Sequence, residues 1–147
     1  MKLSTRGRYG TRALLELAIH YREGMVSLKD IAQRQQISLR YLEHLITPLV
    51  TAGIVLSIRG PRGGGSLAKP PEAIRLSEVI QLLEGSIAPV ACVSDPKYCS
   101  RSDFCVTRDI WGALKKAMDE VLESTTLQDL AERHRKKEQP EPEMYYV

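Results

Sequence analysis

Apolar residues recur at intervals of three and four along most of the chain, a spacing that places them on one face of an α-helix. A first helix is predicted to begin at Ser4 or Thr5 and to end at Gly24. Its apolar stripe comprises Tyr9, Ala13, Leu14, Leu17, Ala18 and Tyr21, and its other face carries Arg6, Arg8 and Arg12. This helix therefore has one side suited to a core and one basic side suited to solvent.

Two further helices are predicted in close succession. Ser27 and Asp30 have the spacing of a helix cap and predict a short helix that ends near Gln35. Ser38 can cap a longer helix that ends near Gly53. The apolar stripe of this longer helix comprises Leu42, Leu45, Ile46 and Leu49. A short helix, a tight turn and a longer helix is the arrangement of a helix-turn-helix motif.

After Gly53 the apolar period changes to two, which is the period of a β-strand. Ile54, Leu56 and Ile58 share one face of this first strand, and a glycine-rich turn at 60–65 leads to a second strand at 66–69. Because glycine allows a backbone to approach a surface closely, the turn is suited to contact a ligand. The pattern predicts a β-hairpin, or wing, beside the helix-turn-helix.

The longest helical pattern covers residues 107–123, after a shorter one over 76–83 that Gly85 ends. Little sequence follows the long helix to cover its apolar stripe, so we expect a second copy of the chain to cover it. The residues expected in this dimer interface are Ile110, Leu114, Met118, Val121 and Leu122. The alternative is that the long helix packs back on its own head. Thr126 and Asp129 predict one more short helix.

Together these patterns predict a mainly α-helical fold with a small β-hairpin. They divide the chain into a winged helix-turn-helix head (1–84), a cysteine loop (85–105), a dimerisation helix with a short following helix (106–136) and a flexible tail (137–147). No run approaches the roughly 18 apolar residues of a membrane span. We therefore expect a cytoplasmic protein without a membrane partner.

Charge is distributed unevenly along the chain. Residues 1–70 carry 11 Lys/Arg and 4 Asp/Glu, whereas residues 71–147 carry 10 and 14. A basic half is typical of proteins that bind polyanions, and a wing beside a helix-turn-helix indicates double-stranded DNA. The expected DNA contacts are Ser38, Arg40, Tyr41, Glu43 and His44 in the second helix of the motif, and Arg59, Gly60 and Arg62 in the wing.

The expected contacts differ in chemistry. Arg40 can pair with guanine or phosphate, Glu43 can accept a hydrogen bond from cytosine N4, and Ser38 at a helix N-terminus can hold a phosphate. Arg59 suits a narrow A·T-rich minor groove, where the negative potential is concentrated. The alternative for each residue taken alone is a solvated surface side chain.

All three cysteines lie in one loop, as Cys92, Cys99 and Cys105 with the spacing C-x6-C-x5-C. An odd number of thiols in a reducing compartment argues against a disulfide framework. Thiolates bind iron, zinc and iron–sulfur clusters, and a helix N-terminus lowers the pKa of a nearby thiol. The spacing differs from those of zinc fingers and ferredoxins. A metal site, redox-active thiols and inert cysteines all remain open at this point.

Nothing in the sequence indicates an enzyme. His20, His44 and His134 are far apart, and no nucleophile–base set accompanies them. The string GPRGGG is not followed by a strand-to-helix transition, so it fits a wing better than a nucleotide-binding loop.

Four strings carry a resemblance to a known family: LSTRGRYG at the start, SLRYLEHLITPL in the second helix of the motif, SIRGPRGGG in the wing, and STTLQDLA near the end. They resemble the Rrf-two family of winged-helix transcription regulators over nearly the whole chain. The resemblance implies a homodimeric regulator, expected to be a repressor, on a palindromic operator. In the IscR-like branch it also implies that Cys92, Cys99 and Cys105 hold an iron–sulfur cluster, [2Fe-2S] in preference to [4Fe-4S], that tunes operator binding.

The chain departs from the IscR-like pattern at one position and resembles a second branch elsewhere. Arg108 stands where IscR-like proteins carry a ligating histidine, and a guanidinium cannot bind a metal. The fourth ligand is open among Asp95, Asp103, Asp109, an exogenous thiol and water. The strings LLEGSIAPV and STTLQDLA resemble the CymR-like branch, which lacks the cysteine loop. The alternatives are thus a cluster-free repressor of cysteine and sulfur metabolism, gated by thiols or a partner, or a regulator with structural zinc.

Overall fold

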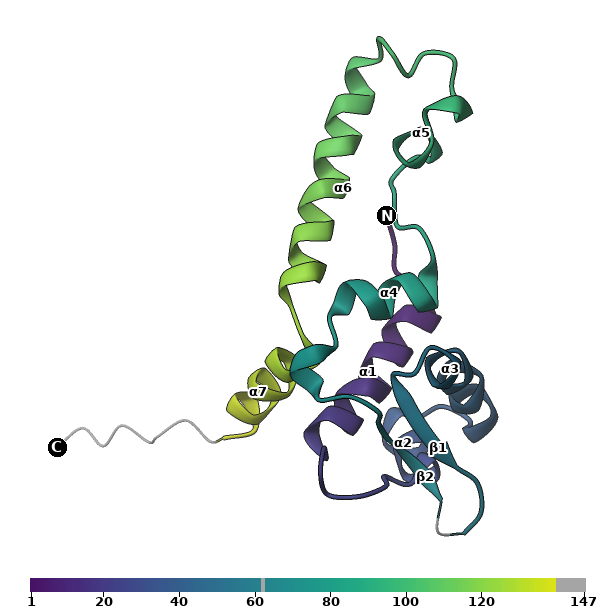
Figure 1. The fold of residues 1–147 in the computed structure, drawn as a ribbon, viewed down its shortest axis with the longest axis vertical. Helices are drawn as coiled ribbons and strands as arrows, with labels where there is room; N and C mark the ends of the chain where they lie inside the picture. Colours follow the sequence, from purple (N-terminus) through teal and green to yellow (C-terminus); the bar gives the residue numbers. More distant parts are fainter. Residues whose placement is uncertain (62, 140–147) are drawn as a thin grey trace, which may run out of the picture.

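The computed structural model describes residues 1–61 and 63–139 (Figure 1). It is mostly helical with one two-stranded antiparallel hairpin, which confirms the predicted fold class. The elements in chain order are α1 (Thr5–Ile19), α2 (Leu28–Gln35), α3 (Leu39–Thr51), β1 (Val55–Ile58), β2 (Gly64–Leu67), the 3₁₀ turn η1 (Pro71–Ala73), α4 (Leu76–Glu84), α5 (Ala91–Ser94), the 3₁₀ turn η2 (Pro96–Tyr98), α6 (Val106–Ser124) and α7 (Leu127–Glu138).

Serine caps fix where the first three helices begin. The hydroxyl oxygens of Ser4, Ser27 and Ser38 each accept a hydrogen bond from a backbone N–H in the first turn of the helix that follows. The first helix ends at Ile19 rather than at the predicted Gly24. His20 is the C-cap residue, and Arg22 beyond it adopts a positive φ of 73°, which a helix continuing to Gly24 does not allow.

The core of the head lies between α1, α3, α4 and α7. The predicted stripe of α3 is fully confirmed, since Leu42, Leu45, Ile46 and Leu49 are all buried. Two glycines of α1, which the apolar pattern did not indicate, allow α4 to approach closely. A Cβ atom on Gly10 would lie 2.4 Å from Leu83 Cδ1, and one on Gly7 would lie 2.2 Å from Glu84 Oε1.

The carboxylate of Glu84 also closes the N-terminus of α1. Its Oε1 accepts hydrogen bonds from the backbone N–H of Ser4 at 2.9 Å and of Gly7 at 3.0 Å, and from the Ser4 hydroxyl. A carboxylate at this position also compensates the positive end of the helix dipole. The last residue of α4 therefore holds the first turn of α1.

The hairpin pairs Val55 with Leu67 at its base and Ile58 with Gly64 near its tip. The second strand begins at Gly64, two residues before the predicted start, because Gly64 and Gly65 pair with Ile58 and Ser57 of β1. Gly65 also forms a β-bridge with Val26. A Cβ on Gly64 would lie 2.2 Å from the carbonyl oxygen of Val26, so this glycine accommodates the chain's own backbone. Leu56 and Ile58 share an exposed face, as the period of two predicted for them. Ile54, predicted to lie on the same face, instead precedes β1 and is fully buried, so the prediction was wrong for this residue.

The arm consists of α6, which stands away from the head in Figure 1. It covers the predicted range 107–123 with one further residue at each end. Along one side it packs on α4 near its base and on α5 near its tip. No residue of α6 is fully buried.

The last helix returns to the head and is longer than predicted. Leu127 and Ala131 of α7 lie in the same core as α1, and a capping box between Thr126 and Asp129 starts the helix. α7 continues to Glu138, so the prediction of a flexible tail from residue 137 was wrong for its first two residues. Basic residues in the last turn favour this continuation because they compensate the helix dipole. Residues 140–147 of the predicted tail lie outside the described residues.

Candidate nucleic-acid interface and thiol loop

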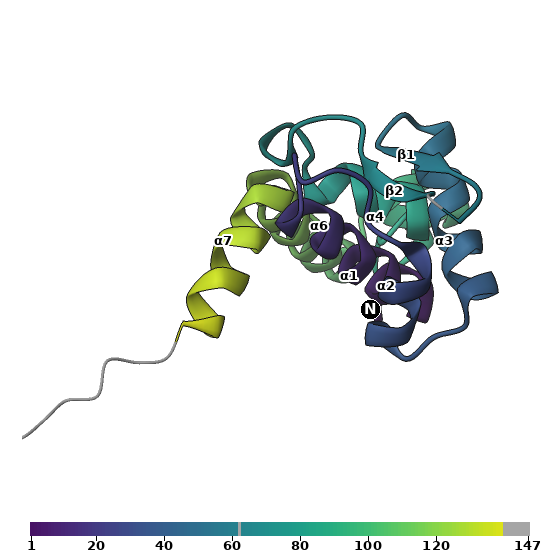
Figure 2. The same cartoon turned by 90° about the horizontal axis from the view of Figure 1, so that it is seen from below.

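The exposed face of α3 carries most of the predicted DNA contacts. Arg40, Glu43 and His44 are exposed, on the side opposite the buried stripe. Ser38 is also exposed, and its hydroxyl oxygen accepts from the backbone N–H of Tyr41 at 3.0 Å. The hydroxyl hydrogen remains able to donate to an anion. These four polar side chains lie on α3, which packs on β1 of the hairpin, and the two elements lie side by side in Figure 1 and Figure 2.

Tyr41 is half-buried because it packs on α1. Its ring meets the ring of Tyr9 edge to face, with centroids 6.4 Å apart. The guanidinium groups of Arg12 and Arg8 lie 5.3 Å and 6.0 Å from the Tyr9 ring centroid. Both arginines lie on the predicted outer face of α1, but that Tyr9 connects them to α3 was not predicted. The available signal was the spacing of three residues between Tyr9 and Arg12, which brings two side chains together on a helix.

The tip of the hairpin presents Arg59 and Gly60 to solvent. Gly60 has a φ of 107°, a conformation that favours glycine, and its carbonyl accepts from the N–H of Gly63 at 2.9 Å. The tight turn thus exposes Arg59 at the edge of the wing. The predicted contact Arg62 lies outside the described residues.

The three cysteines are spread over the loop that precedes α6. Cys92 lies in α5, Cys99 follows η2, and Cys105 is the N-cap residue of α6. All three are free thiols; Cys99 is exposed and the other two are half-buried. In Figure 1 this loop lies at the far end of the arm from the wing, so the thiols are remote from the expected DNA surface.

Two polar side chains hold the loop together. The hydroxyl of Ser102, the one buried polar residue of the described chain, donates to the carbonyls of Pro96 at 2.7 Å and Cys99 at 2.9 Å. Arg108 Nε donates to the carbonyl of Cys92 at 3.0 Å, and its Nη1 donates to the carbonyl of Ser102 at 3.5 Å. Arg108, which stands in place of the expected histidine ligand, therefore ties α6 to the loop.

The thiol of Cys105 has a pKa below its ordinary value. The main cause is a hydrogen bond between its sulfur and the Thr107 hydroxyl, at 3.2 Å, and the backbone N–H of Arg108 adds to it. Hydrogen-bond donors at the start of a helix favour the thiolate. Because the thiolate is the form that binds metals and attacks electrophiles, the lowered pKa makes Cys105 more reactive than an ordinary thiol.

The loop supplies part of what a metal or cluster site needs. Three thiols are soft donors suited to iron–sulfur clusters and zinc, and they account for three of the four protein ligands that such sites commonly use. Among the described residues, however, no three Cys, His, Asp or Glu side chains gather around one point. Asp95, one candidate fourth ligand, accepts from the N–H of Lys97 at 3.0 Å. The donor chemistry fits a cluster, and the loop would have to rearrange to bring the donors together.

The predicted interface residues lie on α6 with unequal exposure. Ile110 is 62% exposed and Val121 is 63% exposed. Leu114, Met118 and Leu122 are half-buried, on the sides of the helix closer to the chain's own contacts. Within one chain the structure therefore leaves two of the five predicted interface residues uncovered, and their role in a dimer stays a prediction.

None of the described helices has the length and hydropathy that crossing a membrane requires.

The residues 3–133 match the family Rrf2, described as "Iron-dependent Transcriptional regulator". Protein rrf2 of Nitratidesulfovibrio vulgaris is 50% identical over 130 residues, which cover 88% of this chain and 87% of the relative. The HTH-type transcriptional regulator CymR of Bacillus subtilis is 46% identical over 131 residues, covering 89% and 90%.

Solved structures give the same relationship. The structure described as "T. potens IscR" superposes with a TM-score of 0.80 at 41% identity and covers 99% of this chain and 97% of its own. The relatives are winged-helix transcription regulators and not enzymes, as the sequence analysis predicted. With its matched residues, its helix-turn-helix and its wing, the chain belongs to the Rrf2 family of HTH transcription regulators.

Proposed function

We propose that the chain acts in the cytoplasm as a homodimeric repressor on a palindromic operator. The observation that carries this proposal is the polar face of α3 beside the Arg59 tip of the wing, in one head with a basic sequence. In this arrangement α3 enters a major groove and the wing reaches the adjacent backbone or minor groove.

Each residue of this surface has a distinct role in the proposal. Arg40 pairs with guanine or phosphate, and Glu43 accepts from cytosine N4. Ser38 donates its hydroxyl hydrogen to a phosphate at the N-terminus of α3. Tyr41 orients the start of α3 through its contact with Tyr9, and the cations Arg8 and Arg12 extend the phosphate-binding surface onto α1.

His44, Gly60 and Arg62 complete the proposed DNA surface. His44 is exposed on α3 within reach of a groove, and Gly60 lets the wing approach a phosphate closely. Arg62 is proposed as a second wing cation on the strength of its place in the sequence.

The proposed dimer forms along α6. Ile110 and Val121 supply the exposed apolar centre, and the half-buried Leu114, Met118 and Leu122 flank it. A two-fold contact of this kind sets two heads on the two halves of a palindrome.

We further propose that the thiol loop tunes operator binding. Cys92, Cys99 and Cys105 would hold an iron–sulfur cluster, [2Fe-2S] in preference to [4Fe-4S], which supplies sensitivity to iron, oxidants or nitric oxide. The chain's own part is mechanical. Cys105 begins α6 and Arg108 fastens α6 to the Cys92 carbonyl, so a rearranged loop changes the start of the dimer helix and the spacing of the heads.

A cluster-free repressor is the second candidate, and the likeness to CymR favours it. In this case oxidation of the activated Cys105 thiol, or a protein partner, acts on the same loop. A structural zinc ion held by the thiols is the third candidate.

Operator binding is tested by fluorescence anisotropy on a duplex selected from genomic DNA at a stated salt concentration. Arg59→Ala and Arg40→Ala should each weaken specific binding by about 1–3 kcal/mol. Arg133→Ala, an exposed arginine on α7, serves as the charge-matched control and should leave specific binding within about twofold. Equal binding by all four proteins would overturn the proposed surface.

The thiols are tested by anaerobic purification with visible absorbance and iron, sulfide and zinc analysis. Iron and sulfide in wild type that are absent from Cys99→Ala support the cluster. A colourless, metal-free protein that still binds its operator selects the cluster-free regulator, and zinc without visible absorbance selects the structural ion.

A further inference from the structure

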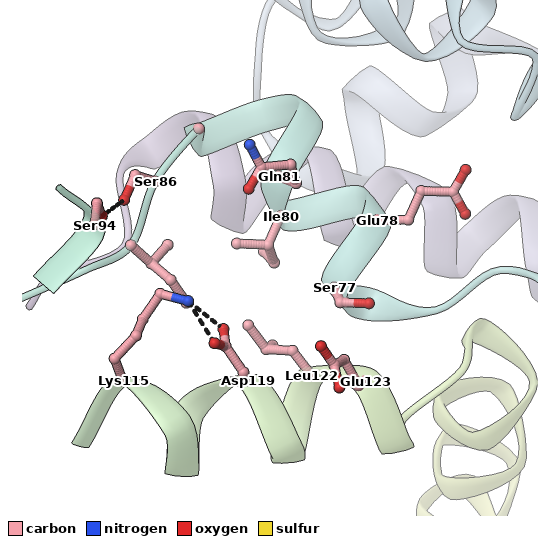
Figure 3. Close-up of a pocket in the computed structure, with 12 residues that line it drawn as sticks. Ser77, Glu78, Ile80, Gln81, Ser86, Ser94, Lys115, Asp119, Leu122 and Glu123 are labelled. Atoms are coloured by element: carbon pink, nitrogen blue, oxygen red, sulfur yellow. Dashed lines mark hydrogen bonds and ion pairs between the residues drawn. The ribbon is translucent and has the colours of Figure 1, made fainter. Parts of the chain in front are cut away.

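A pocket of about 460 Å³ lies between the head and the arm. Ser94 of α5, the helix that contains Cys92, lines one end of it, but no cysteine and no residue of α3 does. Figure 3 shows that α4 forms its roof, α6 forms its floor, and the chain between them closes one end. This volume is within the range of small-molecule sites in proteins. Neither the α3 surface nor the cysteines use it.

The pocket places both signs of charge beside an apolar centre. Lys115 Nζ donates to both carboxylate oxygens of Asp119, at 2.6 Å and 2.5 Å. Ile80 from α4 and Leu122 from α6 face each other at the centre (Figure 3). Glu123 lies at the far end of the pocket, and the described residues contain no ion pair to its carboxylate.

Lys115 and Asp119 can each form further hydrogen bonds besides the ion pair between them. An ammonium group has three hydrogens, and a carboxylate accepts about four hydrogen bonds, so Lys115 and Asp119 can each take a ligand group without separating. The hydroxyls of Ser86 and Ser94, 3.2 Å apart, lie at the Lys115 end of the pocket and can donate to an anionic group. Hydrogen bonds between charged groups in a partly enclosed site are stronger than neutral ones.

Apart from Leu122, which lines the pocket and is also one of the expected interface residues, the pocket is distinct from the expected dimer interface. At about 100° per residue, Lys115 and Asp119 lie roughly 140–180° around the helix from Ile110, whereas Val121 lies within about 20° of it. Burial agrees, because the side chain of Lys115 is 25% exposed whereas Val121 is 63% exposed. A partner on the apolar stripe would therefore leave the pocket side of α6 to the chain's own head.

We propose that this pocket binds a small zwitterion of amino-acid size. The ligand carboxylate accepts from Lys115 and the serine hydroxyls, its ammonium donates to Asp119, and a short apolar side chain rests on Ile80 and Leu122. A ligand there contacts both α4, whose last residue holds α1, and α6, so it fixes the angle between head and arm. Its effect on operator affinity rests on the proposed function, whereas its binding does not.

The binding test uses the full chain without DNA and the standard L-amino acids as probes, first by thermal shift and then by calorimetry. At least one amino acid should bind. Its amide and its N-acetyl derivative each lack one charge and should bind at least about tenfold more weakly, or not at all. Lys115→Ala and Asp119→Asn should each weaken binding by about tenfold or more. Lys116→Ala, the neighbouring exposed lysine outside the pocket, should bind as wild type does.

Three results would overturn the proposal: no amino acid binds, the amide binds as tightly as its parent, or Lys115→Ala and Asp119→Asn retain wild-type affinity. Circular dichroism of each variant separates lost binding from lost folding, and Ser94→Ala offers a milder change in the same pocket. Operator binding is measured separately on the same proteins. A chain that binds its operator but no amino acid refutes only the pocket, and one that binds an amino acid but no duplex refutes only the DNA proposal.

Discussion

The head and the arm are built from the same kind of amphipathic helix, but only the helices of the head are covered within one chain. In α3 all four stripe residues are at most 3% exposed, whereas Ile110 and Val121 of α6 are more than 60% exposed. Loss of apolar exposure is the main favourable term in folding, so α3 is fixed by its own chain. Ile110 and Val121 would gain the same stabilisation only from the proposed partner chain.

The largest expected effect comes from placing a charge on that stripe. Val121→Asp should weaken dimerisation by about 3 kcal/mol, more than a hundredfold, because the carboxylate loses its hydration in the interface. Sedimentation velocity over a dilution series measures the dissociation constant. Lys116→Asp introduces the same side chain on an exposed polar position of α6 and should leave the dimer intact. Equal dissociation of both variants would place the interface elsewhere.

The next effect contrasts a glycine of the head with a glycine of the arm. Gly10→Ala should destabilise the chain by about 1–3 kcal/mol, because its Cβ would lie 2.4 Å from Leu83 in a packed core. Gly112→Ala in α6 should instead stabilise by up to about 1 kcal/mol, because nothing lies within 4 Å and alanine is the better helix former. Urea unfolding of both variants measures the difference, and a shared sign would contradict the proposed contrast in packing.

The glycines also show why the sequence predicted the head's helices better than their packing. Serine caps and apolar periods are local signals, so the starts of α1, α2 and α3 and the stripe of α3 could be read directly. The closeness of α1 to α4 depends on residues more than 70 positions apart, and no local pattern records it. The return of α7 to the core was missed for the same reason.

The candidate sites differ in the same way, because some follow from a local sequence pattern and others form between segments that are separate in the sequence. The exposed side of α3 is the complement of its buried stripe, so its polar residues followed from the period of the helix. Arg108 could be excluded as a ligand from its chemistry, but its two bonds to loop carbonyls depend on how the chain folds back between Cys92 and α6. The pocket between α4 and α6 likewise arises from two separate helices.

A smaller effect is expected from cutting the tie between the arm and its loop. Arg108→Met keeps the length of the side chain but removes both donors, so residues 92–105 should exchange their amide hydrogens about tenfold faster or more. The free energy of unfolding of the whole chain should change by less than about 0.5 kcal/mol, because the loop contributes little to the core. Unchanged exchange in the loop, measured by mass spectrometry, would show that Arg108 does not hold it.

The smallest effect concerns a single proton on Cys105. In a chain with Cys92→Ser and Cys99→Ser, the rate of alkylation by iodoacetamide should rise with pH around a midpoint below that of an ordinary thiol, because the folded state lowers the pKa of Cys105. Thr107→Val removes the hydroxyl that is the main cause, so the midpoint should move upward and the rate at neutral pH should fall. In the denatured chain the two midpoints should coincide, because the bond to Thr107 requires the start of α6. If Thr107→Val leaves the folded midpoint in place, the hydroxyl does not activate this thiol, and the thiol-gated alternative loses its structural support while the DNA surface of the head remains unaffected.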